Sequence, residues 1–245
     1  MLFGAHQSIG GGLDQALKRI AAIGGDCLQI FSSSPREWNK PKMLTNPAKF
    51  LIPIYFHATY LINLADPGEI GRKSIEMLVA ELNFAKEIGV IGSVVHLGSY
   101  KNGNALKENM KEVLAKTPKE TFLIAENSGT RKIGQTLDEL AEIAGWDSRI
   151  RICLDTCHLH AAGYHLNDFS LWNKLELVHI NDSKDEFGSL RDRHENIGRG
   201  KIGTEEFRKV INDPHLKNTP LILEVPGFDG KGPDKMNLDI LKSLV

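Results

Sequence analysis

Nine residues of types that bind divalent metal ions stand at similar places in this sequence. They are five histidines and four carboxylates: His57, His96, Glu126, Asp155, His158, His179, Asp192, His194 and Glu224. Six of them end, or nearly end, short apolar runs such as IPIYFH, SVVHL, TFLIAE and LILEV. Imidazole and carboxylate ligands suit zinc or another borderline divalent ion, and no ligand position is a cysteine. The set therefore predicts a catalytic metal centre rather than a cysteine-rich structural zinc site.

Two local motifs sharpen this prediction. In LDTCH, Asp155 and His158 are three residues apart where a strand turns into its loop. In DRH, Asp192 and His194 alternate in an extended segment and so can point to the same side. Each motif alone is weak, because a strand-end histidine is commonly a hydrogen-bonded structural residue and a strand-end carboxylate commonly caps a helix. The joint occurrence of such residues on six predicted strands favours the metal centre.

These residues need elements that bring them together. Short apolar runs alternate with helical patterns along the chain, which is the signature of repeated βα units. In a (β/α)₈ barrel the carboxyl ends of all eight strands meet on one face, so ligands distant in sequence become neighbours. The length of 245 residues suits one such barrel of about 250 residues. We therefore predict an α/β fold with a single (β/α)₈ TIM barrel, in one catalytic domain over residues 1–245.

The predicted elements begin with a strand in LFGA, a helix over 10–24 and a second strand in CLQIF. A polar, proline-containing segment over 32–46 predicts a substantial exposed loop. The periodic stretch 69–89 predicts a long amphipathic helix that ends at Gly89. Further helices are expected near residues 104–116, 136–144, 204–212 and 234–244.

Composition adds general expectations. Hydrophobic residues make up 41% and charged residues 25%, as in ordinary soluble globular proteins. No apolar run approaches the roughly 20 residues of a membrane span, and the start lacks a basic segment followed by an apolar one. We therefore expect a cytoplasmic protein without a membrane contact. The three cysteines, Cys27, Cys153 and Cys157, are an odd number in a long chain, which disfavours a disulfide framework.

The assembled residues resemble the endonuclease IV family of zinc-dependent abasic-site DNA endonucleases. The resemblance covers almost the whole chain, through GAHQSIGGGLDQAL, HATYLINL, VVHLGS, AENSG, LDTCHLHAAGY, VHINDSKDEFGSLRDRHENIGRG and LILEVPG. It implies three Zn²⁺ ions at the barrel mouth, although Mn²⁺ or Fe²⁺ would also accept these ligands. It assigns His57 and His96 to the first ion, with Glu126 as the bridge to the second. It assigns the remaining ligands to the second ion (Asp155, His179, Glu224) and to the third (His158, Asp192, His194).

The resemblance also implies a reaction, which is hydrolysis of the phosphodiester 5′ to an abasic site, leaving 3′-hydroxyl and 5′-deoxyribose-phosphate ends. Divalent ions suit this reaction because they lower the pKa of a bound water to about 7 and neutralise charge on phosphate oxygens. Glu126 and Glu224 are the expected catalytic residues. Glu224 would orient or deprotonate the attacking water, or serve only as a ligand.

The implied partner is double-stranded DNA that contains abasic sites. The resemblance places Arg36, Tyr60 and Leu61 at positions that insert into the duplex, whereas the alternative for Tyr60 and Leu61 is packing in the helix that follows. The formal charge of −1 is not basic, but three Zn²⁺ would add six charges and bring it to +5. Basic residues of the mouth loops could contact phosphates, namely Arg36, Lys40, Lys42, Lys184, Arg191, Arg193, Arg199 and Lys201.

Two other functions compete with this interpretation. A sugar isomerase or epimerase of the same barrel superfamily would share several ligands, but it uses one or two metals and does not require His158, Asp192 and His194. A non-catalytic DNA-binding protein would have no reason to keep all nine ligands, and a metal-dependent nicking test separates it from an enzyme. We expect a monomer, with a connection between Asp155 and His179 that is shorter than in larger relatives.

Overall fold

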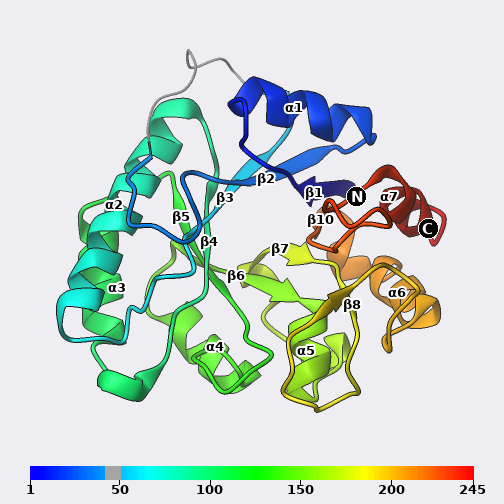
Figure 1. Ribbon diagram of the computed structural model, residues 1–245. Coiled ribbons are helices and arrows are strands. Elements are labelled where there is room, and N and C mark those ends of the chain that lie inside the picture. The colour runs from blue at the N-terminus through cyan, green and yellow to red at the C-terminus, as the bar shows by residue number, and fades with distance from the viewer. Residues whose placement is uncertain (42–50) are drawn as a thin grey trace.

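Eight parallel strands close into a barrel in the computed structural model, which describes residues 1–41 and 51–245 (Figure 1). Around the barrel they follow the order β1-β10-β7-β6-β5-β4-β3-β2, and every neighbouring pair is parallel. Their bounds are Leu2–His6 (β1), Cys27–Phe31 (β2), Ile54–His57 (β3), Gly92–Val95 (β4), Phe122–Glu126 (β5), Ile150–Asp155 (β6), Leu175–His179 (β7) and Pro220–Leu223 (β10). The predicted TIM barrel is confirmed, so all eight carboxyl ends face one side.

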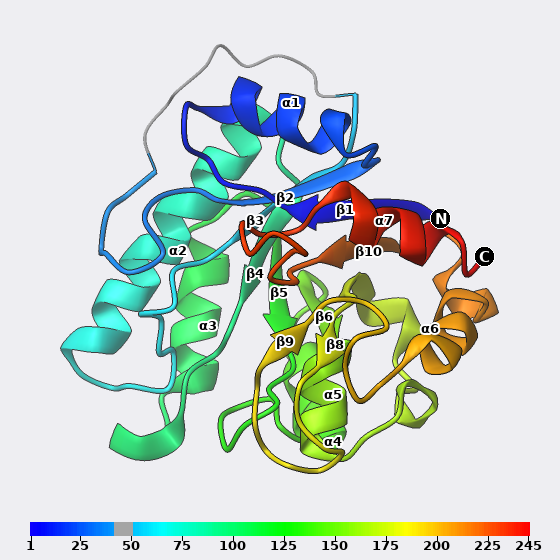
Figure 2. The same cartoon turned by 45° about the vertical axis from the view of Figure 1, so that its right-hand side comes forward.

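Seven α-helices surround the barrel over the described residues (Figure 1, Figure 2). They are α1 (Leu13–Ala22), α2 (Glu69–Ile88), α3 (Leu106–Ala115), α4 (Leu137–Gly145), α5 (Thr156–Ala162), α6 (Thr204–Ile211) and α7 (Lys235–Lys242). The predicted long helix ends as expected, because Gly89 adopts the left-handed conformation (φ 81°) that favours glycine. Residues 32–41 of the predicted loop form neither helix nor strand, and residues 42–46 lie outside the described part.

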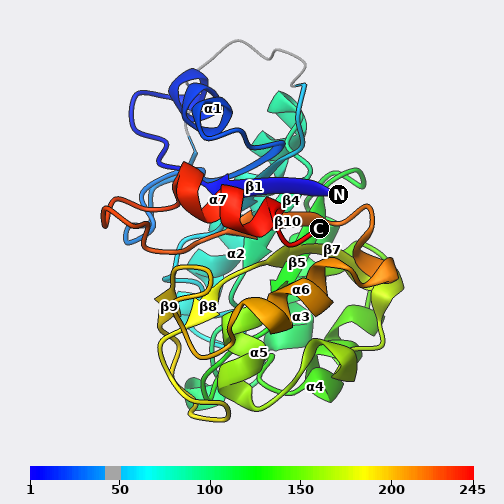
Figure 3. The same cartoon turned by 90° about the vertical axis from the view of Figure 1, so that its right-hand side faces the viewer.

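A small hairpin stands outside the barrel, between β7 and α6. Its strands are β8 (Asp182–Ser183) and β9 (His194–Glu195), which pair antiparallel. In Figure 3, β1 runs leftward from the amino terminus, and the hairpin lies on the left, the side of the strand carboxyl ends. The buried Asp182 carboxylate fixes the following loop by accepting hydrogen bonds from the backbone N–H groups of Gly198, Gly200 and Ile202.

The barrel interior is built in layers. Seven strands each contribute one residue to a closed apolar cluster: Cys27, Tyr55, Val94, Ile124, Cys153, Leu177 and Ile222. Side chains two residues apart on a strand point to the same face, so the next inward layer follows from the alternation. That layer consists of Gln29, His57, His96, Glu126, Asp155, His179 and Glu224. The barrel thus presents polar side chains toward its mouth above an apolar floor.

The cysteine expectation is also confirmed. Cys27, Cys153 and Cys157 are all free and buried. In the part of the chain that the structure describes, no helix is both long and apolar enough to cross a bilayer.

One carboxyl group within the packed layer between helix and barrel gives a stability prediction. Glu81 of α2 is buried and contacts the hydroxyl groups of Ser32 and Ser93. Burial raises the pKa of Glu81, and the two serine hydrogen bonds oppose that rise only in part. A carboxyl group held neutral in this way resembles the side-chain amide of glutamine.

We therefore expect Glu81→Gln to change the free energy of unfolding by less than about 1 kcal/mol. Glu81→Ala leaves a cavity and two serines without their partner, and we expect it to cost about 2–4 kcal/mol. Denaturant titration of both variants at neutral pH measures the difference. An equal loss in the two variants would show that Glu81 is needed as a charged group.

Candidate metal centre

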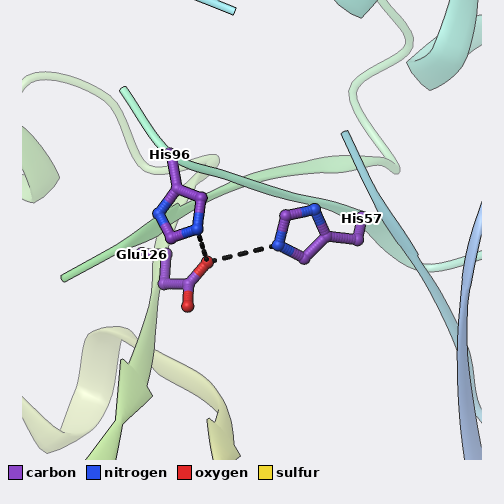
Figure 4. A group of neighbouring side chains, drawn as sticks. All are labelled: His57, His96 and Glu126. Atoms are coloured by element: carbon purple, nitrogen blue, oxygen red, sulfur yellow. Dashed lines mark ion pairs between the residues drawn. The ribbon is translucent and has the colours of Figure 1, made fainter. Parts of the chain in front are cut away.

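The first group of ligand atoms comes from three adjacent strands. His57 ends β3, His96 follows β4 and Glu126 ends β5, and the dashed lines in Figure 4 join both imidazoles to the carboxylate. Glu126 Oε2 lies 3.4 Å from His57 Nε2 and 3.3 Å from His96 Nε2. This oxygen is buried, and within the described chain it accepts no hydrogen bond. A buried carboxylate oxygen without a partner is costly, so the position fits a bound cation.

The second group uses the other oxygen of the same carboxylate. Glu126 Oε1 lies 3.1 Å from His179 Nδ1, which also lies 3.4 Å from Glu224 Oε2 and 3.9 Å from Asp155 Oδ2. One ligand atom from each of these four residues falls within 4.8 Å of the others. The two oxygens of Glu126 therefore face two different groups, which is the arrangement of a bridging carboxylate.

The third group joins helix α5 to the hairpin. His158 Nε2 lies 3.0 Å from Asp192 Oδ2, while His194 Nε2 lies 3.4 Å from Asp192 Oδ1 and 3.5 Å from Asp155 Oδ2. His194 Nε2 is buried, and across residues 1–41 and 51–245 it has no hydrogen-bond partner. Ligand atoms of Asp155, His158 and His194 all lie within 4.8 Å of one another, and Asp192 contacts each histidine through a different oxygen. Asp155 therefore lies between the second and third groups.

The environment of His158 differs from the sequence prediction in one respect. We expected a loop directly after β6, but α5 begins at Thr156 without an intervening loop. Asp155 caps this helix, because its Oδ1 accepts a hydrogen bond from the His158 backbone N–H (2.9 Å). The cap places His158 in the first helical turn, beside the carboxylate with which it shares the site.

Backbone carbonyl groups orient three of the imidazole rings. The Nδ1 atoms of His57, His158 and His194 lie 2.8, 3.0 and 3.3 Å from carbonyl oxygens of Ala58, Asn127 and Glu224. A carbonyl oxygen only accepts, so each Nδ1 carries a proton, and each Nε2 faces the site, where it can bind a metal ion once it is unprotonated. Metal-binding histidines are commonly held in this way.

Gln29 performs the same task for His179, and sequence reasoning missed it. Its side-chain N–H donates to Glu224 Oε1 (2.6 Å), so its oxygen accepts from His179 Nε2 (2.8 Å) and leaves Nδ1 for the site. The Gln29 amide also lies 3.0 Å from His6 Nδ1, so His6 is hydrogen-bonded beside the cluster. The available signal was a polar residue inside the buried run CLQIF, two positions after Cys27.

The buried carboxylates give the centre a negative potential. Burial favours the neutral form of Glu126, but its interactions with the surrounding imidazoles of His96, His179 and His57 outweigh burial and lower its pKa well below the usual value. Burial likewise opposes charge on His57, yet the carboxylates of Glu126, at 3.4 Å, and Glu224 raise its pKa to about 9. His96 differs, because burial dominates and lowers its pKa to about 4. The cluster therefore attracts cations, either protons or metal ions.

Two cysteines lie beside these groups without changing the ligand set. Cys153 approaches Glu126 and His179, and Cys157 approaches Asp192 and His194. Burial raises the pKa of both thiols. The thiolate is the form that binds metal, so both side chains are neutral buried residues rather than ligands.

The residues predicted to contact DNA lie at the same mouth. Tyr60 is 56% exposed, and its ring centroid lies 5.5 Å from that of His57. Its backbone N–H donates to the Pro35 carbonyl (3.1 Å), which joins its loop to that of the exposed Arg36. Leu61 is partly exposed in the same turn. Helix α2 begins only at Glu69, so Tyr60 and Leu61 lie outside the helix in which the alternative placed them.

Comparison with known proteins decides the family. A family model described as Xylose isomerase-like TIM barrel matches residues 17–244. A Thermosipho melanesiensis protein named Probable endonuclease 4 is 37% identical over 266 residues, covering 91% of this chain and 92% of its own length. A Chloroflexus aggregans protein of the same name is 32% identical and covers 99% and 97%. The chain belongs to the endonuclease IV family.

A solved structure supports the same family. The crystal structure of endonuclease IV from Thermus thermophilus matches with a TM-score of 0.87 and 33% identity, over 100% of this chain and 98% of that one. Membership of the endonuclease IV family makes the chain an enzyme of the nuclease class. A D-tagatose 3-epimerase-like protein also matches, with a TM-score of 0.75 and 20% identity, which shows the shared barrel alone.

This chain is shorter than the alignment with its Chloroflexus relative. The alignment with the Chloroflexus protein extends over 279 residues, whereas this chain has 245. The relative therefore carries segments that this chain lacks.

Proposed function

We propose that this endonuclease IV family member hydrolyses the phosphodiester 5′ to an abasic site in double-stranded DNA, leaving 3′-hydroxyl and 5′-deoxyribose-phosphate ends. The convergence of all nine predicted ligands on three neighbouring groups carries the proposal. A sugar isomerase would use the first two groups, but it has no need of His158, Asp192 and His194. The names of the relatives, which are endonucleases, support the same choice.

We assign three Zn²⁺ ions to these groups, with Mn²⁺ or Fe²⁺ as acceptable substitutes at some positions. His57, His96 and Glu126 would hold one ion, and Glu126, Asp155, His179 and Glu224 a second. His158, Asp192 and His194 would hold the third, and Asp155 lies between the second and third groups. When bound, such ions lower the pKa of water and neutralise the charge on phosphate oxygens. The unpartnered Glu126 Oε2 and His194 Nε2, each without a hydrogen bond among the described residues, support this assignment.

The two catalytic carboxylates have different surroundings. Glu126 is fully enclosed, and its role is to fix the spacing of the first two groups through its two oxygens. The Glu224 side chain is 15% exposed, and Gln29 holds one of its oxygens. Burial raises the pKa of Glu224, but the interactions with His179 and with His6, whose Nδ1 lies 3.4 Å from Oε1, outweigh burial and lower the pKa. Glu224 is therefore anionic and can accept a hydrogen bond from the attacking water, in addition to binding metal.

Recognition of the lesion would depend on the loops after β2 and β3. We assign Arg36, Tyr60 and Leu61 to insertion into the duplex, because Arg36 and Tyr60 are exposed in adjoining loops beside the centre. An abasic nucleotide has lost its stacking and pairing, so its extrusion costs less than the few kcal/mol required for an intact nucleotide. Selectivity for the abasic site follows from that difference.

Incubation of metal-loaded protein with a duplex that carries one synthetic abasic site tests the proposal. We expect one nick on the 5′ side of the lesion, and mass spectrometry should identify a 3′-hydroxyl and a 5′-deoxyribose phosphate. Attack of water on phosphorus leaves the sugar intact, whereas a lyase eliminates from the sugar. An unsaturated aldehyde at the new 3′ end would overturn the hydrolytic assignment.

Tyr60→Ala is expected to weaken discrimination between abasic and intact duplex. Loss of an aromatic contact with bases typically costs about 1–3 kcal/mol, or about 5- to 150-fold in the ratio of the two affinities. Binding titrations with both duplexes measure this ratio, while the single-turnover rate at saturating enzyme should change little. Tyr60→Phe keeps the ring and serves as the control. Parent-like discrimination by Tyr60→Ala would make Tyr60 a packing residue.

We also propose that residues 1–245 act as one catalytic domain and as a monomer in the cytoplasm. The family match over residues 17–244 supports the single unit. Light scattering on the metal-loaded protein measures the oligomeric state.

A further inference from the structure

Three of the basic mouth-loop residues that were predicted to contact phosphates interact with carboxylates of the protein itself. Arg193 forms two hydrogen bonds with the Asp185 carboxylate (2.7 and 2.6 Å), and Arg191 approaches the same carboxylate at 3.8 Å. Lys201 pairs with Glu186 at 2.6 Å. Lys42 lies outside the described residues. To contact DNA, the three paired residues on the hairpin side of the mouth (Arg191, Arg193 and Lys201) would therefore have to give up an internal partner.

A different set of cations lines an open groove between the loops after β4 and β5. The groove has a volume of about 820 Å³ and is lined by Ser99, Tyr100, Lys101, Arg131, Lys132, Ile133, Gln135, Thr136 and Glu139. Lys101, Arg131 and Lys132 are exposed. Among the described residues, none of these three forms an ion pair, whereas seven other surface lysines do. Glu139 is already engaged, because it accepts a hydrogen bond from the Gly134 backbone N–H (2.7 Å).

The groove lies close to the metal centre. Tyr100 is four residues from His96, and Arg131 is five residues from Glu126. Chain segments of these lengths span at most about 14 and 18 Å. Because base pairs in B-DNA rise about 3.4 Å, about 18 Å along the duplex corresponds to about five base pairs.

The groove also adjoins the loop that carries Tyr60. The Ser99 backbone N–H donates to Asn63 Oδ1 (3.2 Å), and the Leu64 N–H donates to the Leu97 carbonyl (3.0 Å). The loops after β4 and β5 meet where the Ile133 N–H donates to the Gly98 carbonyl (3.1 Å). These contacts join the loops after β3, β4 and β5 into one rim. A duplex held at Tyr60 therefore has this rim as its neighbour.

We propose that this groove binds the sugar-phosphate backbone of the duplex within about five base pairs of the lesion, through Lys101, Arg131 and Lys132. The proposal rests on the proposed function, since it concerns how the same substrate is held. The exposed ring of Tyr100 supplies an apolar wall against which a deoxyribose can pack. The contacts are to the backbone, so they add affinity independent of sequence and leave the chemical step unchanged.

The test compares two triple variants with equal loss of charge. One carries Lys101→Ala, Arg131→Ala and Lys132→Ala. The control carries Lys107→Ala, Lys111→Ala and Lys119→Ala, which are exposed residues on α3 and in the connection that follows it. Single-turnover incision of a long abasic duplex at several enzyme and salt concentrations gives the apparent affinity, the maximal rate and the salt dependence.

We expect the groove variant to lose about 10- to 100-fold in affinity and to keep the maximal rate within about twofold. Its slope of log affinity against log salt should be smaller by about 2–3, because each phosphate contact contributes about 0.9. A duplex that ends at the lesion on the side of the groove has no backbone for the groove to contact. It should therefore bind the parent and the groove variant with equal affinity. Parent-like affinity and slope in the groove variant, or an equal loss in the control, would overturn the proposal. No incision by the parent would instead overturn the proposed function.

Discussion

Glu126→Gln is expected to lower the maximal incision rate by about 10³-fold or more, which corresponds to about 4 kcal/mol in the activation barrier. Each oxygen of Glu126 faces a different ligand group, so the amide removes a charge from both groups at once. The amide nitrogen would also point its hydrogens at imidazole lone pairs or at a bound cation. Substrate affinity should change much less, because Glu126 is buried below the exposed mouth that we assign to DNA.

Glu81→Gln provides a matched control for this variant. It is the same chemical change at a buried glutamate whose carboxyl contacts serine hydroxyls. Single-turnover rates at saturating enzyme separate the two positions, and denaturant titration checks that both variants fold. We expect Glu126→Gln to fold but to lose the chemical step. Tyr60→Ala should instead keep the chemical step and lose discrimination between abasic and intact duplex. Parent-like incision by Glu126→Gln would remove the bridging carboxylate from the proposed mechanism.

The candidate ligands at strand ends could be predicted from the sequence because the pattern that identifies them is local. A buried strand needs apolar side chains, so a polar residue at its end must have another reason to be there. Six predicted ligands were identified in this way, from His57 on β3 to Glu224 after β10. Gln29 was missed because it lies in the middle of its apolar run rather than at the end. The alternation from Cys27 to Gln29, matched by Tyr55 to His57, is the signal that would have found it.

The rest of the centre depends on contacts that no local pattern contains. His194 lies in a strand of two residues, and the hairpin that carries it is fixed by Asp182 through backbone groups far along the chain. The short helix α5 was missed because the Asp155 cap starts it at the last residue of β6, where we expected a loop. The pairing of Arg193 with Asp185 likewise depends on how the hairpin folds. The DRH spacing identified Asp192 and His194 as candidate ligands and the family resemblance assigned them to the third ion, but neither predicted helix α5 or the pairing of Arg193.

Removal of metal is expected to affect both activity and stability. The number of ions bound per chain is a further test of the centre. Elemental analysis of protein prepared without chelator should find close to three divalent ions per chain. A ligand at about a thousand times its dissociation constant stabilises the folded state by about 4 kcal/mol. In a domain of this size, each kcal/mol raises the Tm by about 2–4 °C. Chelation should therefore abolish incision and lower the Tm by about 10 °C or more, as measured by calorimetry.

A variant of the third group makes this prediction specific. His194→Ala removes one ligand of that group and leaves His57, His96 and Glu126 untouched, so we expect about two ions per chain and a smaller change in Tm on chelation. His215→Ala, at an exposed histidine beside Asp213, controls for the loss of an imidazole and should retain about three ions. A parent that holds a single ion would favour the isomerase alternative, because that chemistry needs no third group. Three ions in the parent and two in His194→Ala would instead require the hairpin to be part of the metal centre, as phosphodiester hydrolysis by three metals demands.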